Sequence, residues 1–102
     1  MTQISIPDAD PAFQKLIELF VEGLATRAEA LEHARLAGDR IALRSLAHQL
    51  KGAAGGYGFV ELGVLAGIVQ QDCQDNVGHE KLAVSVKALV TACQDAANAE
   101  FV

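Results

Sequence analysis

Hydrophobic residues recur at intervals of three and four along most of the chain, which is the spacing of one face of an α-helix. The first stripe begins after Pro11 and extends to about residue 36. Its members are Phe13, Leu16, Ile17, Phe20, Leu24, Leu31 and Leu36. Asp10 as N-cap and Pro11 as first helical residue are typical of a helix start. The pattern therefore predicts one long first helix, ended by Gly38.

Three more helical segments follow, each separated from the last by a few residues. The second runs from about Arg40 to Gly58, because glycine readily takes the left-handed conformation that ends many helices. The third begins near Val60 and fades over 75–78, and the fourth begins near His79 and frays at Asn98. The expected core positions are Ile41, Leu43, Leu46, Leu50 and Ala54, then Leu62, Leu65, Ile68 and Val69, then Leu82, Val86, Leu89, Val90 and Cys93.

Four helices joined by short connections pack as antiparallel neighbours. We therefore predict an all-α fold, an antiparallel up-down-up-down four-helix bundle with a short N-terminal extension. No segment alternates as a strand would. The 102 residues form one expected domain, 1–102, with a tail at 1–9 and the bundle at 10–101. A composition with 51% hydrophobic but only 5% aromatic residues fits closely packed helices better than a β-sandwich.

Charge and hydropathy exclude several classes of partner. The formal net charge is −5 and no Lys/Arg cluster stands out, so we expect no nucleic-acid binding. No segment resembles a signal peptide or reaches membrane-spanning length, so we expect a cytoplasmic protein without a membrane. Cys73 and Cys93 lack CxxC spacing, and we expect two buried thiols, with a disulfide or metal pair as the alternative. Because of Met1 and a full bundle without a linker we expect a free-standing protein, and a domain cut from a longer protein stays open as the alternative.

Common catalytic templates are missing from the sequence. The glycines do not form a phosphate-binding loop, and His79-Glu80 lacks the second histidine of a zinc helix. No Ser or Cys lies in a nucleophile-elbow context. A metal-binding bundle would need paired Glu-x-x-His motifs, whereas Glu29, Glu32 and His33 supply only one histidine. We therefore expect no cofactor and no metal, and His33 and His79 are expected to be ordinary surface side chains.

The stretch AHQLKGAAGGYG, residues 47–58, combines a helical first half with four glycines in seven residues. Each interior glycine costs a helix about 1 kcal/mol relative to alanine. If Leu46 and Leu50 face inward, His48 lies about 200° around the helix and points outward. Gly52 and Gly55 would leave the surface beside it bare. Close packing and access are equally open for Gly56.

Other polar residues are predicted near His48. Arg44 lies one turn before it and Lys51 one turn after it. A turn centred near Phe59 puts Gln70 level with His48, and its neighbours Gln71 and Gln74 also carry amides. An amide can hydrogen-bond a phosphoryl oxygen without adding negative charge. For Arg44 and the three glutamines, a plain polar surface is the alternative.

His48-Gln49-Leu50-Lys51-Gly52, followed by small residues and Gly58, resembles the HxLKG…G signature of histidine-containing phosphotransfer (HPt) domains. That family is a four-helix bundle of about this size with its histidine on the second helix, so the resemblance covers essentially the whole chain. It implies that His48 receives a phosphoryl group from a receiver-domain aspartate and passes it to another. Lys51 would offset the phosphate charge, and Gly52 would keep bulk away from the ring.

The sequence also departs from the HPt pattern at two places. Ala53 and Ala54 replace the small hydroxyl residues often found there, and position 70 is Gln where the pattern often has Glu close by. Neither change removes a reacting group.

The resemblance implies a phosphocarrier rather than an enzyme. An exposed imidazole, with an ordinary pKa of about 6.5, can attack phosphorus at neutral pH. The receiver would supply Mg²⁺, and no nucleotide site is visible. Receiver domains and a hybrid histidine kinase are the expected partners of a monomer. The direction of phosphate flow stays open, as does the alternative that the domain was cut from a hybrid kinase. The alternative is an interaction-only bundle that docks a receiver or kinase without carrying phosphate.

Overall fold

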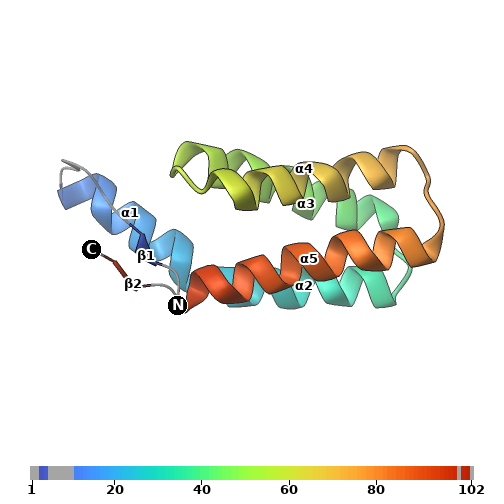
Figure 1. Cartoon of the computed structure of the whole chain (residues 1–102), viewed down its shortest axis with the longest axis horizontal. Helices are drawn as coiled ribbons and strands as arrows, with labels where there is room; N and C mark the ends of the chain where they lie inside the picture. Colours follow the sequence, from blue (N-terminus) through green and yellow to red (C-terminus); the bar gives the residue numbers. More distant parts are fainter. Residues whose placement is uncertain (1–2, 5–10, 99, 102) are drawn as a thin grey trace.

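The computed structural model describes residues 3–4, 11–98 and 100–101. The described helices are α1 (Pro11–Glu22), α2 (Leu24–Leu36), α3 (Arg40–Gly56), α4 (Val60–Gln74) and α5 (His79–Ala97) (Figure 1). Helices α2 to α5 form the predicted antiparallel four-helix bundle. Two short strands, β1 (Gln3–Ile4) and β2 (Glu100–Phe101), pair in parallel.

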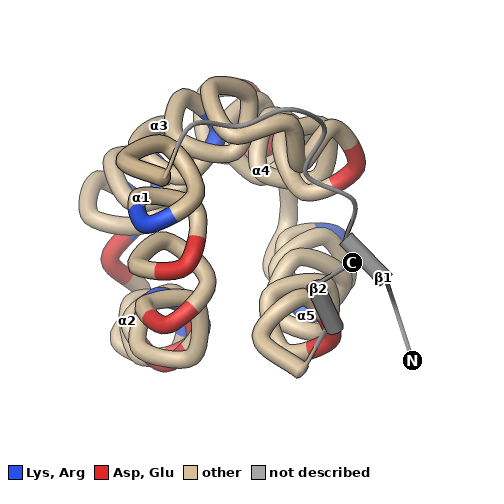
Figure 2. The backbone as a smooth tube through the Cα atoms, turned by 90° about the vertical axis from the view of Figure 1, so that its left-hand side faces the viewer, with Lys and Arg blue, Asp and Glu red and all other residues tan. Residues whose placement is uncertain are grey.

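The four bundle helices occupy the corners of a square when the molecule is viewed along its length (Figure 2). α3 packs on α4 and α2 packs on α5, while α4 also contacts α5 and α2 contacts α3. Each helix therefore neighbours the next one in the chain, which is the up-down-up-down arrangement. None of the described helices is both long and apolar enough to cross a bilayer.

The connections from α2 to α3 and from α3 to α4 are tight because glycines occupy left-handed positions. Gly38 has φ +68° after α2, and Gly58 has φ +84° after α3, as predicted for the end of that helix. Asp39 caps α3, since its carboxylate accepts a hydrogen bond from the Ala42 amide at 3.0 Å. These signals make α3 begin and end at defined residues.

The first helix is not one long helix, as predicted, but two. Gly23 has ψ −8°, far from the value of about −42° in a regular helix. Its amide donates to the carbonyls of both Leu19 and Phe20, each at 3.2 Å. α1 therefore leaves the direction of α2 (Figure 1). Phe20 packs against Tyr57 and Phe59 in the α3–α4 connection, with ring centroids 5.3 and 5.2 Å apart, and this contact fixes the tilt.

The prediction was also wrong at the C-terminal end. The bundle was expected to continue to residue 101, whereas α5 ends at Ala97 and Glu100–Phe101 forms β2. Because β1 is the partner of β2, a strand pair absent from the sequence-based expectation brings residues near the two ends together. Asp10, the predicted N-cap, and residues 1–2 and 5–9 of the predicted tail lie outside the described residues.

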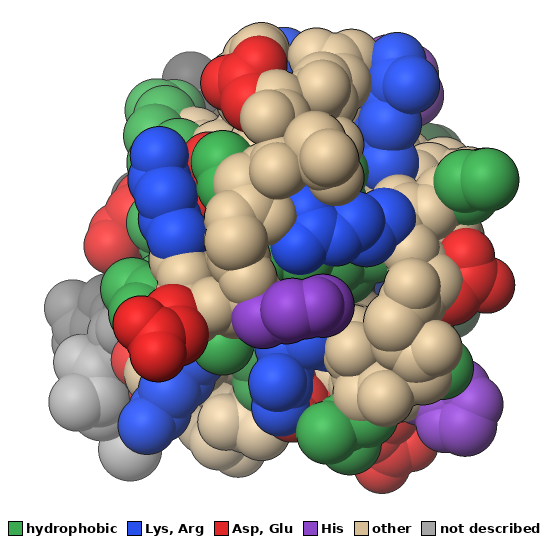
Figure 3. All heavy atoms as spheres, turned by 90° about the vertical axis from the view of Figure 1, so that its right-hand side faces the viewer, with side chains coloured by type: hydrophobic (Ala, Val, Ile, Leu, Met, Phe, Trp, Pro, Cys, Tyr) green, Lys and Arg blue, Asp and Glu red, His purple; other side chains and the backbone are tan. Residues whose placement is uncertain are grey.

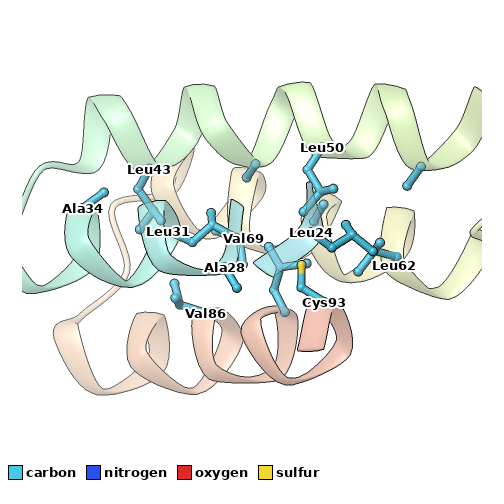
Figure 4. Close-up of a cluster of buried hydrophobic side chains, with 14 of the residues drawn as sticks. Leu24, Ala28, Leu31, Ala34, Leu43, Leu50, Leu62, Val69, Val86 and Cys93 are labelled. Carbon is cyan, nitrogen blue, oxygen red and sulfur yellow. The ribbon is translucent and has the colours of Figure 1, made fainter. Parts of the chain in front are cut away.

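One buried cluster joins the five helices, and part of it is shown in Figure 4. Its largest fully buried side chains are Leu24, Leu31, Leu43, Leu50, Leu89, Val69, Val86 and Cys93. Alanines that the hydrophobic pattern did not single out are also buried, namely Ala28, Ala34, Ala47 and Ala66. Small residues at these positions let the helix backbones approach closely.

Several predicted core residues are instead exposed. Leu36 is 72% exposed and Ile41 is 87% exposed, because both flank the turn between α2 and α3, where neighbouring helices end. Phe13 and Leu16 on α1, and Ile68 on α4, are likewise exposed. Leu46, Leu65 and Val90 are only partly buried. The spacing of large residues alone therefore misplaced the edges of the buried face.

Candidate functional site

His48 is exposed on α3, as predicted, although the buried face of that helix differs from the expected one. The buried residues of α3 are Leu43, Ala47, Leu50 and Ala54, with Ala47 where Leu46 was expected. At about 100° per residue, His48 lies about 130° from the centre of this face. The ring is therefore on the shoulder of α3 rather than on its far side.

Three contacts set the register between α3 and α4. A Cβ at Gly63 would lie 3.9 Å from both Ala54 Cβ and Gly55 N, and a Cβ at Gly67 would lie 3.6 Å from Lys51 Cδ. Further along, Arg44 reaches Gln74. Each step backward along α3 is thus matched by a similar step forward along α4. This register puts His48 level with Gln70 and Gln71, as the sequence-based alignment expected.

Arg44 and Gln74 are hydrogen-bonded to each other. With the Gln74 amide oriented so that its oxygen faces the guanidinium, it accepts from Arg44 Nε at 3.3 Å and from Nη2 at 2.7 Å. Because the acceptor is neutral, Arg44 keeps its full positive charge one turn before His48.

The two other glutamines of α4 differ in their hydrogen bonds. Gln71 Nε2 donates to Asp75 Oδ1 at 2.9 Å. Gln70 is half-buried, and its Oε1 is a buried acceptor without a partner among the described residues. An unpaired buried acceptor is costly unless another group satisfies it. Gln70 is therefore the amide at the level of His48 that is ready to accept a further hydrogen bond.

Lys51 lies across α4 at Gly67. A Cβ on Gly67 would be 3.7 Å from Lys51 Cε and 4.0 Å from Nζ. The ion pairs among the described residues join Lys15 to Glu18, Arg35 to Glu32, and Lys81 to Asp72, and none includes Lys51. The ammonium three residues after His48 is thus uncompensated by a carboxylate within the part of the chain that the structure describes.

The helical glycines of α3 face open space. A Cβ at Gly52, Gly55 or Gly56 would meet nothing within 4 Å. Close packing against a neighbouring helix is therefore excluded as the reason for Gly56. Gly52 and Gly55, which follow His48 by one and two turns, leave the surface beside the imidazole free of side chains.

An open groove runs between α3 and α4 next to Lys51. Its floor and walls are Gly55, Val60, Gly63, Val64, Gly67 and Ile68, with Lys51 and Gln71 also lining it. Val60, Val64 and Ile68 are 73%, 58% and 45% exposed. Sequence reasoning missed this surface, because Ile68 was assigned to the core. The four-residue spacing from Val60 to Val64 to Ile68 could have indicated a second apolar face on α4.

Comparison with protein-family models matches the Hpt domain over residues 15–99. The chain belongs to the Hpt domain family. Comparisons with curated proteins and with solved structures gave no match. Membership supports a phosphotransfer role in two-component signalling, where Hpt domains act as phosphocarriers that interact with receiver domains and kinases.

This Hpt domain has a net charge of −5, yet positively charged side chains are grouped on one part of its surface (Figure 3). Figure 3 shows Lys, Arg and His side chains gathered on the end of the bundle where α3 begins and α4 ends. Near this end, burial raises the pKa of the Cys73 thiol, and the charges of Arg40 and Arg44 oppose that shift in part. The Arg40 guanidinium has a buried Nη1 without a partner among the described residues.

The other histidines and the two cysteines of the Hpt domain lie on helices other than α3. His33 on α2 and His79 at the start of α5 are exposed. No group of three His, Cys, Asp or Glu residues suited to a metal ion occurs among the described residues. Cys93 is buried, as expected, whereas Cys73 is only partly buried, and both thiols are free.

Proposed function

We propose that this Hpt domain carries a phosphoryl group on His48 between receiver-domain aspartates. The observation that carries the proposal is an exposed imidazole on α3, with bare glycine surface beside it and, one turn away, Lys51, which forms no ion pair among the described residues. A nucleophile in this setting can be approached by a second protein. An exposed histidine in these surroundings has no structural role that would explain its presence.

The transfer step needs only this arrangement and a receiver. A ring nitrogen of His48 attacks the phosphorus of the aspartyl phosphate, a P–N bond forms, and the P–O bond to the aspartate breaks. The carboxylate leaves on the receiver, and the second ring nitrogen keeps its proton, for which the unpaired side-chain oxygen of Gln70, at the same level of the bundle, would be an acceptor. Because phosphoryl transfer depends on in-line positioning and charge neutralisation, the ammonium of Lys51 would stabilise the transferring oxygens. Mg²⁺ would come with the receiver.

The α3–α4 groove supplies a docking surface for the receiver. Val60, Val64 and Ile68 offer exposed apolar area directly beside Lys51. An apolar patch next to the reacting group favours a short-lived complex with a partner whose own surface is partly apolar. Arg44 adds a cation that would attract the acidic site of a receiver.

We infer that residues 1–102 act as one monomeric carrier domain in the cytoplasm, with receiver domains and a hybrid histidine kinase as partners. Two free thiols fit a reducing compartment. The chain would not phosphorylate itself from ATP, so it would be a carrier without an enzymatic reaction of its own.

The test is phosphate transfer from a radiolabelled, phosphorylated receiver domain in the presence of Mg²⁺. We expect acid-labile, base-stable label on the wild-type chain and none on His48→Gln. His33→Gln and His79→Gln are matched controls, because both histidines are exposed, and each should retain the label. Label that persists in His48→Gln would refute the assignment. A stable complex with the receiver but no label would instead support the interaction-only alternative.

A further inference from the structure

The Lys51 side chain lies against the neighbouring helix α4 and forms no ion pair within the part of the chain that the structure describes. Its stem passes over α4 at Gly67, where an added Cβ would lie 3.6 Å from Cδ and 3.7 Å from Cε. No ion pair among the described residues includes Lys51. Long cationic side chains cover apolar surface with their methylene groups while the charged group stays in water. The stem of Lys51 therefore has α4 at Gly67 as its neighbour, while its ammonium is exposed.

We propose that Gly67 is a positioning residue for Lys51, acting through the absence of a side chain. The bare backbone of α4 leaves a path along which the Lys51 stem crosses from α3, so that the ammonium stays beside Gly67, one helical turn along the bundle from the level of His48. This inference rests on the proposed phosphotransfer at His48. It assigns to α4 a part in the site that is separate from that of the glutamines.

Gly63, one turn earlier on α4, shows why the role belongs to Gly67. A Cβ at Gly63 would meet Lys51 O at 3.8 Å, Ala54 Cβ at 3.9 Å and Gly55 N at 3.9 Å. These contacts involve backbone and a core side chain, so Gly63 lets α3 and α4 approach each other. At Gly67 the three nearest atoms all belong to the Lys51 side chain, Cδ, Cε and Nζ. Only Gly67 therefore adjoins the functional part of that lysine.

The size of the residue at position 67 should matter in a graded way. A single Cβ would make ordinary van der Waals contact with the lysine stem, since the distances are 3.6 to 4.0 Å. A leucine would place further carbons in the volume that Cδ and Cε occupy. The stem would then leave α4, and the ammonium would sample many positions in solvent.

A double-mutant cycle tests the proposal. Gly67→Ala and Gly67→Leu are made in the wild-type chain and in Lys51→Ala, and single-turnover transfer from a phosphorylated receiver domain is measured as a function of receiver concentration. We expect Gly67→Leu to slow the maximal rate about tenfold, to the level of Lys51→Ala, and Gly67→Ala to slow it less. In the Lys51→Ala background, Gly67→Leu should have no further effect on the maximal rate. Equal slowing in both backgrounds would mean that the leucine obstructs docking, and this would overturn the proposal, as would no slowing at all.

A measurement without phosphate separates this inference from the proposed function. ¹³C relaxation at Lys51 Cε reports the mobility of the stem in the unphosphorylated chain. We expect restricted motion in the wild type, and motion as free as that of the exposed Lys87 in Gly67→Leu. If Lys51 is already as mobile as Lys87 in the wild type, Gly67 does not position it, whether or not His48 carries phosphate. If Gly67→Leu does not fold, the same comparison is made between the wild type and Gly67→Ala, where an intermediate increase in motion is expected.

Discussion

The guanidinium of Arg44 on α3 donates two hydrogen bonds to the side-chain oxygen of Gln74 on α4, with Nε at 3.3 Å and Nη2 at 2.7 Å in the amide orientation that satisfies both groups. The pair joins the first half of α3 to the end of α4 and fixes the guanidinium one turn from His48. Because the partner is an amide, the cation is held in place without being neutralised. The neighbourhood of His48 thus keeps a positive charge in a protein that is acidic overall.

Replacing the Gln74 amide by a carboxylate should keep Arg44 in place but neutralise its positive charge. In Gln74→Glu, Arg44 would form an ion pair that raises the free energy of unfolding by at most about 1 kcal/mol, as is usual for exposed pairs. The added negative charge should weaken receiver association and slow transfer to His48. Urea denaturation and single-turnover transfer measure the two effects. Gln94→Glu on α5 adds the same charge far from α3, and a similar loss of transfer there would contradict a local effect.

The glycines of α3 permit a second test. A larger residue in place of a glycine should stabilise the helix, but it should hinder the approach of a receiver to His48 if it lies beside that residue. Gly52→Gln and Gly56→Gln should both raise the free energy of unfolding by about 0.5–1 kcal/mol, since glutamine is the better helix former and neither position contacts another element. Only Gly52→Gln, one turn from His48, should slow transfer from the receiver. Equal rates for the two variants would show that the bare surface is not required for approach.

Burial of the Cys93 thiol predicts an alkaline loss of stability. Desolvation raises the pKa of Cys93 from an ordinary 9.0 to about 11, with the charge of Arg27 opposing the shift. The fold therefore favours the neutral thiol, and the stabilising contribution is complete below about pH 9 and disappears as the pH rises to about 11. A shift of this size corresponds to roughly 3 kcal/mol.

Comparing the wild type with Cys93→Ala by urea denaturation at several pH values isolates this contribution. The variant should be about 1 kcal/mol less stable at neutral pH because it leaves a small cavity. Its stability should then fall less steeply than that of the wild type between about pH 9 and 11. Parallel curves over that range would show that Cys93 does not titrate with a raised pKa in the folded protein.

Two leucines that the hydrophobic pattern treated alike should respond very differently to truncation. Leu50 is fully buried in α3, two residues after His48, so Leu50→Ala should lower the free energy of unfolding by about 2–5 kcal/mol. Leu36 lies at the exposed end of α2, so Leu36→Ala should lower the free energy of unfolding by no more than about 0.5 kcal/mol. Thermal or urea denaturation measures both. Similar losses would mean that Leu36 is covered in solution.

The sequence by itself determined where α3 and α4 begin and end and where α5 begins, whereas it missed the start of α2 at Leu24. Asp39 as a cap, Gly38 and Gly58 as left-handed stops and the spacing of Leu43 and Leu50 are local signals, because each acts within one or two turns of helix. The same local reasoning placed His48 on the outside of α3. It also set the register with α4 closely enough to bring Gln70 level with the imidazole.

The tertiary structure decided where the first helix breaks, which residues are buried, and which side chains of α3 and α4 meet. The α1–α2 break at Gly23 depends on Phe20 packing against Tyr57 and Phe59, which are more than thirty residues away. Ala47 is buried and Ile41 exposed because burial depends on where neighbouring helices pass, a property that periodicity within one helix does not contain. In the same way, Lys51 lies on Gly67 and Arg44 binds Gln74 only because α3 and α4 pack in one register. Local sequence specifies most of the helix ends and the exposure of His48, whereas contacts between helices set the position of the charges around that histidine.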